Sequence, residues 1–183
     1  MEISNDVGLS SLLASSEETQ LCTGFGFTEG PVWVAADDCL LFSDIPGNKI
    51  HRWRPGSESA EVYRDPSGFS NGLTLDGAGN LLACEHRGRR VSRGAYNAPG
   101  DDVAHYLDGK SLNSPNDLVI ANEGRIYFTD PDYGLPRPGR THPGMGVADG
   151  TQEIDLQGVY RVDPDGALSL VVEDFSQPNG LAF

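Results

Sequence analysis

Short apolar segments separated by polar turns run through the whole chain. CLLFSD, LLACEH and RIYFTD each follow a polar turn, and each is followed by another short apolar stretch. No window keeps apolar residues at the 3.6-residue period of a helix. Glycine (23) and proline (12) are frequent among the 183 residues, which favours short elements joined by tight turns. The pattern therefore predicts an all-β protein.

One motif recurs four times: a polar residue, then Gly or Asp, then an apolar strand. The copies begin at Glu29, Asn71, Asn116 and Asn179. Repeats of roughly 40–50 residues with four short strands each are typical of β-propeller blades. An all-β sandwich is the alternative, but a sandwich does not repeat one motif at this period. We predict a propeller over residues 25–183, preceded by an N-terminal segment, residues 1–24.

The interval between the third and fourth copies is longer than the others. It holds PRPGRTHPGMGVADGTQEIDLQ, residues 136–157, a stretch rich in glycine, proline and polar residues. Insertions in propeller blades fall in loops on one face, often the binding face. We therefore expect residues 136–157 to form an exposed loop.

A residue just before the innermost strand of a blade lies at the rim of the central channel. We therefore expect Glu29, Asn71, Asn116 and Asn179 to form a ring of side-chain oxygens. One carboxylate with several amide oxygens suits a hard cation such as Ca²⁺. Each Asn alone is more often a turn former, because Asn tolerates the left-handed backbone that turns use. Their recurrence at one phase of the repeat favours the metal site.

Composition narrows the range of partners. The formal net charge of −14 repels phosphate backbones, so we expect no nucleic-acid partner. The three cysteines show no CxxC spacing, and we expect Cys39 and Cys84 to be buried in strands. No stretch reaches transmembrane length, and the N-terminus lacks the basic region of a secretory signal. These features predict a cytoplasmic protein with no membrane partner.

The phrases EGPVW, LNSPNDLVI, YFTDPDYGL and QPNGLAF occur in this order along the chain. They resemble the SMP-30/gluconolactonase/LRE-like family of six-bladed propellers, in particular its bacterial gluconolactonase-like branch. The resemblance implies one divalent cation, foremost Ca²⁺, with Zn²⁺, Mg²⁺ or Mn²⁺ as alternatives. It implies metal ligands at Glu29, Asn116 and Asn179, and it places Asn71 in the substrate pocket. Asn116 is also the residue we expect to contact the substrate and to act in catalysis.

The resemblance also implies that the chain holds about three blades and one further strand. Six blades of ~45 residues need about 270 residues. A fourth metal ligand of the family, an Asp about one blade beyond Asn179, has no counterpart in the sequence. We therefore expect a partial propeller that keeps metal-binding residues and has weak or no activity. Its open edge would favour self-association. A fragment of a longer product, a truncated gene product and a half completed by another chain all stay open.

The activity implied by the resemblance is hydrolysis of a sugar lactone to its aldonic acid. The cation would hold the ring carbonyl and stabilise the oxyanion as water attacks. His86 and Tyr133 end or follow second strands, and we expect both to hydrogen-bond the substrate, although a surface position for His86 is an equal alternative. Two other functions stay open: a metal- or ligand-binding propeller without activity, and a related esterase or organophosphate hydrolase.

Overall fold

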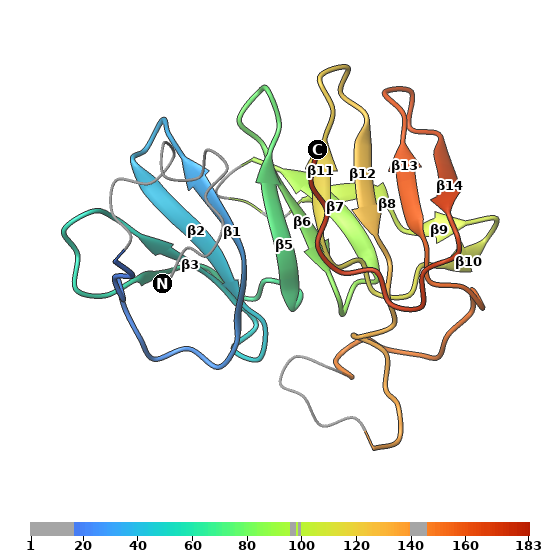
Figure 1. The fold of residues 1–183 in the computed structure, drawn as a ribbon, viewed down its shortest axis with the longest axis horizontal. Coiled ribbons are helices and arrows are strands. Elements are labelled where there is room, and N and C mark those ends of the chain that lie inside the picture. Colours follow the sequence, from blue (N-terminus) through green and yellow to red (C-terminus); the bar gives the residue numbers. More distant parts are fainter. Residues whose placement is uncertain (1–16, 96–97, 99, 140–145) are drawn as a thin grey trace.

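The computed structural model describes residues 17–95, 98, 100–139 and 146–183, and these residues form three antiparallel sheets of four strands (Figure 1). Blade 1 consists of β1 (Thr28–Val34), β2 (Cys39–Asp44), β3 (Lys49–Trp53) and β4 (Glu61–Arg64). Blade 2 consists of β5 (Ser70–Leu75), β6 (Leu81–Glu85), β7 (Arg90–Gly94) and β8 (Asp101–Ala104). Blade 3 consists of β11 (Leu118–Ile120), β12 (Ile126–Thr129), β13 (Val159–Val162) and β14 (Leu168–Val172). A hairpin of β9 (Tyr106–Leu107) and β10 (Lys110–Ser111) lies between blades 2 and 3 in the chain.

The predicted all-β class and the predicted four-strand blades are confirmed by these sheets. Each blade is a meander in which strands pair in chain order, and the first strands β1, β5 and β11 are neighbours. Most of the N-terminal segment predicted for residues 1–24 lies outside the described residues. Among the residues that are described, no helix is long and apolar enough to cross a membrane.

Two apolar cores lie between the blades. The core between blades 1 and 2 contains Val34, Cys39, Leu41, Ile50, Leu73, Leu81 and Ala83. The core between blades 2 and 3 contains Leu82, Cys84, Val91, Leu118, Phe128, Tyr160 and Val162, among others. Successive side chains of a strand point to opposite faces, so β6 alternately supplies one core and then the other. The predicted burial of Cys39 and Cys84 is confirmed, since both are fully buried.

The inner strands approach one another so closely that two positions require glycine. A Cβ on Gly30 would lie 2.1 Å from the carbonyl oxygen of Asn71, and Gly30 has a φ of +56°. A Cβ on Gly72 would lie 2.7 Å from the carbonyl oxygen of Asn116, which accepts the Gly72 N–H at 2.8 Å. The pairing register of β1 and of β5 shifts at these glycines, which marks a β-bulge in each strand.

The insertion at residues 136–157 is only partly the exposed loop that its composition predicts. Residues 136–139 are exposed and residues 140–145 lie outside the described residues, but Ala148 and Ile154 are buried. Ile154 packs in the core between blades 2 and 3, and the Glu153 carboxylate accepts a hydrogen bond from Arg89 at 3.1 Å. The prediction is wrong for this second half because its few apolar side chains reach the core between two blades.

Replacing Gly30 with alanine tests the close approach of the inner strands. We expect Gly30→Ala to lower the free energy of unfolding by about 1–2 kcal/mol through its positive φ and by about 1–3 kcal/mol more through overlap with Asn71. The matched control is Gly79→Ala, which has a φ of +81° but no atom within 4 Å of the added Cβ. Urea unfolding of both variants measures the difference, and equal losses would contradict the packing argument.

A second prediction concerns His51 on β3. The ring is 8% exposed, stacks on Phe42 with centroids 5.6 Å apart, and has no hydrogen bond to either ring nitrogen from the described residues. Burial lowers the pKa of His51, and the nearby carboxylate of Asp44 offsets this only in part. The unfolded chain therefore binds a proton on His51 more readily than the folded chain does. The contribution of His51 to the free energy of unfolding is complete above the unfolded pKa of about 6.5, and it is lost as the pH falls through this value toward the lower folded pKa.

We expect His51→Phe, which keeps an aromatic ring in the stack, to reduce this loss of stability. Urea unfolding between about pH 8 and pH 5 measures it, where one proton contributes at most about 1.4 kcal/mol per pH unit. An unchanged pH dependence in the variant would show that His51 is not the group responsible.

Candidate metal site at the inner strands

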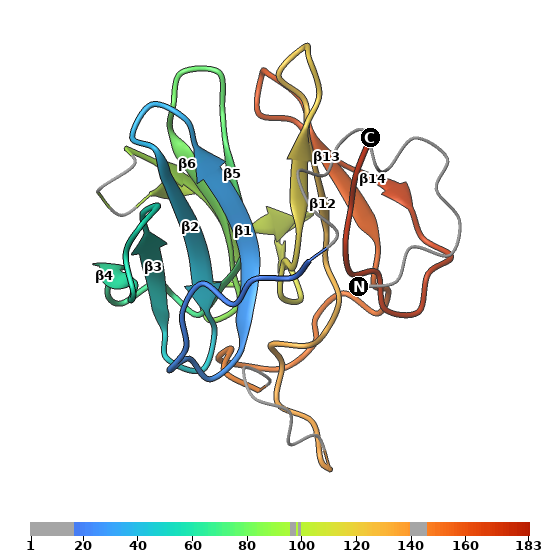
Figure 2. The same ribbon diagram turned by 60° about the vertical axis from the view of Figure 1, so that its left-hand side comes forward.

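The four residues of the repeated motif line one pocket. Glu29 and Asn71 lie at the beginnings of β1 and β5, Asn116 precedes β11, and Asn179 lies on the C-terminal segment. They surround a cavity of about 210 Å³ together with Gly30, Pro31, Leu73, Asp117 and Gly180. Figure 2 shows the first strands of blades 1 and 2 side by side, with blade 3 beside them. The convergence expected from the repeat is therefore present, whereas the chemical role of each residue stays a prediction.

These four side chains differ in their exposure. Asn71 is 6% and Asn116 is 3% exposed, Glu29 is half-buried, and Asn179 is exposed. Asn116 is fixed through its backbone, since its N–H donates to the carbonyl oxygen of Thr129 at 2.9 Å. No hydrogen bond from the described residues reaches the side chains of Glu29, Asn116 or Asn179. Their polar ends are thus available to a ligand.

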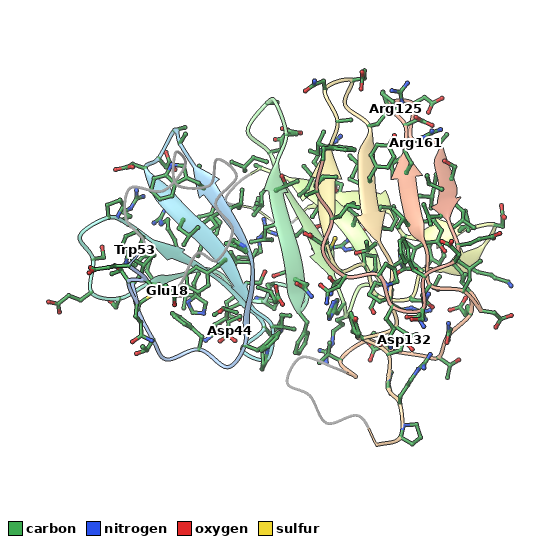
Figure 3. All side chains as sticks on the ribbon, viewed as in Figure 1. Glu18, Asp44, Trp53, Arg125, Asp132 and Arg161 are labelled. Carbon is green, nitrogen blue, oxygen red and sulfur yellow. The ribbon has the colours of Figure 1, made fainter. Side chains whose placement is uncertain are left out.

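Buried carboxylates fix the chain where it approaches two of these positions. Asp44, at the end of β2, accepts hydrogen bonds from the N–H groups of Gly26 and Phe27, both at 3.1 Å. Asp130, directly after β12, accepts them from Asn113 at 2.7 Å and Ser114 at 2.8 Å. In both blades the donors lie three and two residues before the pocket residue. Figure 3 labels Asp44 at the lower end of blade 1 and Asp132, which follows Asp130 by two residues, at the lower end of blade 3, with Arg125 and Arg161 at the upper end of blade 3.

Burial and hydrogen bonding have opposite effects on the pKa of Asp130. Complete burial outweighs the two backbone N–H donors, which favour the ionised form, and the pKa of the carboxyl group is raised to about 7. Both carboxyl oxygens accept a backbone hydrogen bond, as in the ionised form. Asp130 is not among the residues that line the cavity, and its two hydrogen bonds fix the loop before Asn116.

In blade 2 the carboxylate of the acid that ends the second strand binds none of the described backbone N–H groups before Asn71. This acid, Glu85, accepts hydrogen bonds from Arg90 at 2.8 Å and Ser92 at 2.6 Å. The side-chain oxygen of Asn48, from the turn after β2, accepts the N–H of Phe69 at 2.8 Å instead. A residue of one blade thus positions the pocket residue of the next.

The donor set of the cavity fits a hard cation. Its lining contains two carboxylates, Glu29 and Asp117, and three amides, and it includes no Lys, Arg, His or Cys. Within the described ranges no three His, Cys, Asp or Glu residues are grouped as a metal site. Ca²⁺ accepts carboxylate and amide oxygens together, so the amides of Asn116 and Asn179 can serve as ligands beside Glu29.

Asp117 lines the pocket although the repeat did not single it out. It stands where the other copies of the motif have Gly30, Gly72 and Gly180. Its carboxylate accepts the N–H of Leu181 at 3.0 Å. A charged residue in a position otherwise held by glycine was the signal that could have identified it.

His86 and Tyr133 do not line the cavity. His86 is 2% exposed, and its Nε2 lies 3.5 Å from Nδ2 of Asn71, so it lies next to a pocket residue. The alternative that places His86 on the surface is therefore wrong. Tyr133 is half-buried, and its hydroxyl donates to the carbonyl oxygen of Gln177 at 3.4 Å. Contact of either side chain with a substrate stays a prediction.

Known proteins of the gluconolactonase type are similar to this chain over most of its length. The gluconolactonase of Zymomonas mobilis is 34% identical over 170 residues, which cover 85% of this chain and 45% of that protein. An X-ray structure of a gluconolactonase-type protein superposes with a TM-score of 0.81 at 38% identity, over 93% of this chain and 57% of the other. The gluconolactonase XC5397 of Xanthomonas campestris gives a TM-score of 0.71 at 34% identity, over 81% of this chain and 48% of the other.

The chain thus spans about half the length of the relatives it matches. Its three four-stranded sheets are arranged like propeller blades, which confirms the predicted propeller-type fold. Residues 27–183 match the family described as SMP-30/Gluconolactonase/LRE-like region. From the motif order, the fold and this match, the chain belongs to the SMP-30/gluconolactonase/LRE-like family.

Proposed function

We propose that this chain binds one divalent cation, foremost Ca²⁺, and takes part in opening a sugar lactone to its aldonic acid. The observation that carries the proposal is the convergence of Glu29, Asn71, Asn116 and Asn179, from four copies of one motif, on a single oxygen-lined cavity. Membership of a family whose similar members include gluconolactonases supports the choice of substrate class.

In this proposal Glu29, Asn116 and Asn179 hold the cation. One carboxylate binds the ion by charge, while the two amides contribute neutral oxygens and leave it electrophilic. A cation held there would polarise the lactone carbonyl and stabilise the oxyanion that forms when water adds. Zn²⁺, Mg²⁺ or Mn²⁺ are the alternatives that a titration would compare.

The remaining pocket residues would orient the lactone. With the tautomer that leaves Nε2 of His86 unprotonated, Nδ2 of Asn71 donates to it at 3.5 Å, which leaves the side-chain oxygen Oδ1 of Asn71 to accept from a substrate hydroxyl. Asn116 lies between Asn71 and Asn179 in the order of the blades, so it can contact both the cation and the substrate. Pro31 and Leu73 give the cavity an apolar wall that excludes water from one side.

Self-association through the open faces of blades 1 and 3 stays a prediction. Trp33 on β1 is 46% exposed and Val171 on β14 is 47% exposed, and both are large apolar side chains. The mass of the chain in solution, measured by light scattering beside the titrations below, checks it, and a monomer at all concentrations would contradict it.

Replacing Glu29 tests the cation site. We expect Glu29→Gln to weaken Ca²⁺ binding at least tenfold, because the change removes a charge and keeps the shape. Isothermal titration of the metal-free chain measures the affinity. Glu58→Gln, at an exposed position of the same blade, is the matched control and should bind as the wild type does. Equal affinity in wild type and Glu29→Gln would remove Glu29 from the site.

Hydrolysis of glucono-lactone tests the activity. We expect weak turnover above the spontaneous opening in the presence of Ca²⁺, loss of that turnover with a chelator, and a return to the spontaneous rate in Asn116→Ala. Titration of the released acid with base measures the rate. Asn122→Ala, at an exposed position in the turn after β11, is the matched control.

The outcomes separate the proposed function from its alternatives. Ca²⁺ binding without turnover in a folded chain would replace the lactonase proposal with that of a binding module. Turnover on aryl esters or organophosphates but not on lactones would favour a related hydrolase.

A further inference from the structure

The ring position with the least support from regular structure is Asn179. It lies on a C-terminal segment to which the structure assigns no strand, whereas Glu29 and Asn71 lie in β1 and β5. The segment runs beside β11 (Figure 1), and Phe183 packs edge-on against Tyr127 with ring centroids 5.5 Å apart. Something other than a strand ladder must therefore place Asn179 in the cavity.

Thr129 supplies this placement through its hydroxyl group. Thr129 is 1% exposed at the end of β12. Its Oγ1 donates to the carbonyl oxygen of Asn179 at 2.7 Å and accepts the N–H of Asp117 at 3.1 Å. The carboxylate of Asp117 in turn accepts the N–H of Leu181 at 3.0 Å. The backbone on both sides of Gly180 is thus attached to two side chains of blade 3.

Blade 1 contains the equivalent hydrogen bond, which holds the pocket residue of blade 2. Ser43 stands at the corresponding position of β2, directly before the acid that ends the strand, and is fully buried. Its Oγ lies 2.8 Å from the carbonyl oxygen of Asn71 and donates to it. A hydroxyl group at the end of a second strand therefore holds the pocket residue of the following blade in two of the three blades. Cys84 occupies the position in blade 2.

We propose that Thr129, backed by Asp117, is a positioning residue that fixes Asn179 for metal binding. The inference rests on the proposed cation site and adds a residue that does not itself line the cavity. A metal-ligating residue on a segment outside any sheet must lose conformational freedom when the ion binds. Hydrogen bonds that already fix the segment reduce this entropic cost. Partners behind metal ligands change affinity typically by about 10–100-fold when they are removed.

The test compares Ca²⁺ affinity in the wild-type chain, Thr129→Val and Thr129→Ser. Valine keeps the shape of the side chain and removes the hydroxyl, so we expect affinity to fall about tenfold or more. Serine keeps the hydroxyl, as Ser43 does in blade 1, and should restore most of the affinity. The control Ser43→Ala removes the equivalent hydroxyl behind Asn71, which has no metal role in the proposal, and should leave Ca²⁺ affinity unchanged.

Two further measurements separate positioning from a general loss of stability. Thermal unfolding in chelator reports the stability of each variant without metal. The Asn179 side-chain amide resonance, followed by NMR during the Ca²⁺ titration, should shift at a lower Ca²⁺ concentration in the wild type than in Thr129→Val. Positioning predicts this separation even where Thr129→Val and Ser43→Ala unfold at similar temperatures.

Three results would overturn the inference. Wild-type affinity in Thr129→Val would do so while leaving the cation site intact. Equal weakening in Thr129→Val and Ser43→Ala would assign the effect to stability alone. A wild-type chain that binds no divalent cation would overturn the proposed site itself, and this is seen before any variant is compared.

Discussion

The contact on which the structure depends most is the close approach of the inner strands at the pocket. Gly30 packs against the backbone of Asn71, and Gly72 packs against the backbone of Asn116. Without a side chain at these glycines, the carbonyl groups of one blade can lie directly against the next strand. This packing brings residues more than forty positions apart in sequence to one cavity, and it leaves their side chains pointing to common space.

A second layer of polar contacts makes the pocket rigid at its rim. Asp44 and Asp130 take up the backbone N–H groups just before Glu29 and Asn116, and Ser43 and Thr129 hold the carbonyl groups of Asn71 and Asn179. Buried polar groups are stable only when they are hydrogen-bonded, so each such contact fixes the path of the chain. Each blade therefore carries part of the support for its neighbour, and the site is a property of the blade boundaries.

The charge of the pocket suits the proposed cation. Glu29 and Asp117 lie on one cavity, and no cationic side chain lines it. Like charges in partly buried positions repel one another, and a bound cation relieves that repulsion. Sugar lactones are neutral and rich in hydroxyl groups, so the amides of Asn71 and Asn116 are suitable partners beside such an ion. The same set of donors explains both the proposed cation and the proposed substrate class.

The sequence alone determined the strand pattern, the repeat and the positions of Glu29, Asn71, Asn116 and Asn179, because strand alternation and turn residues are local properties of the chain. The exchange of glycine for Asp117 in the third copy is visible in the sequence, but its hydrogen bond to the N–H of Leu181 appears only in the structure. The sequence pattern placed residues 136–157 wholly on the surface, although Ile154 is buried between blades. Contacts between blades join distant residues, so only the tertiary structure decided which side chains line the cavity and which, like Thr129, hold them from behind.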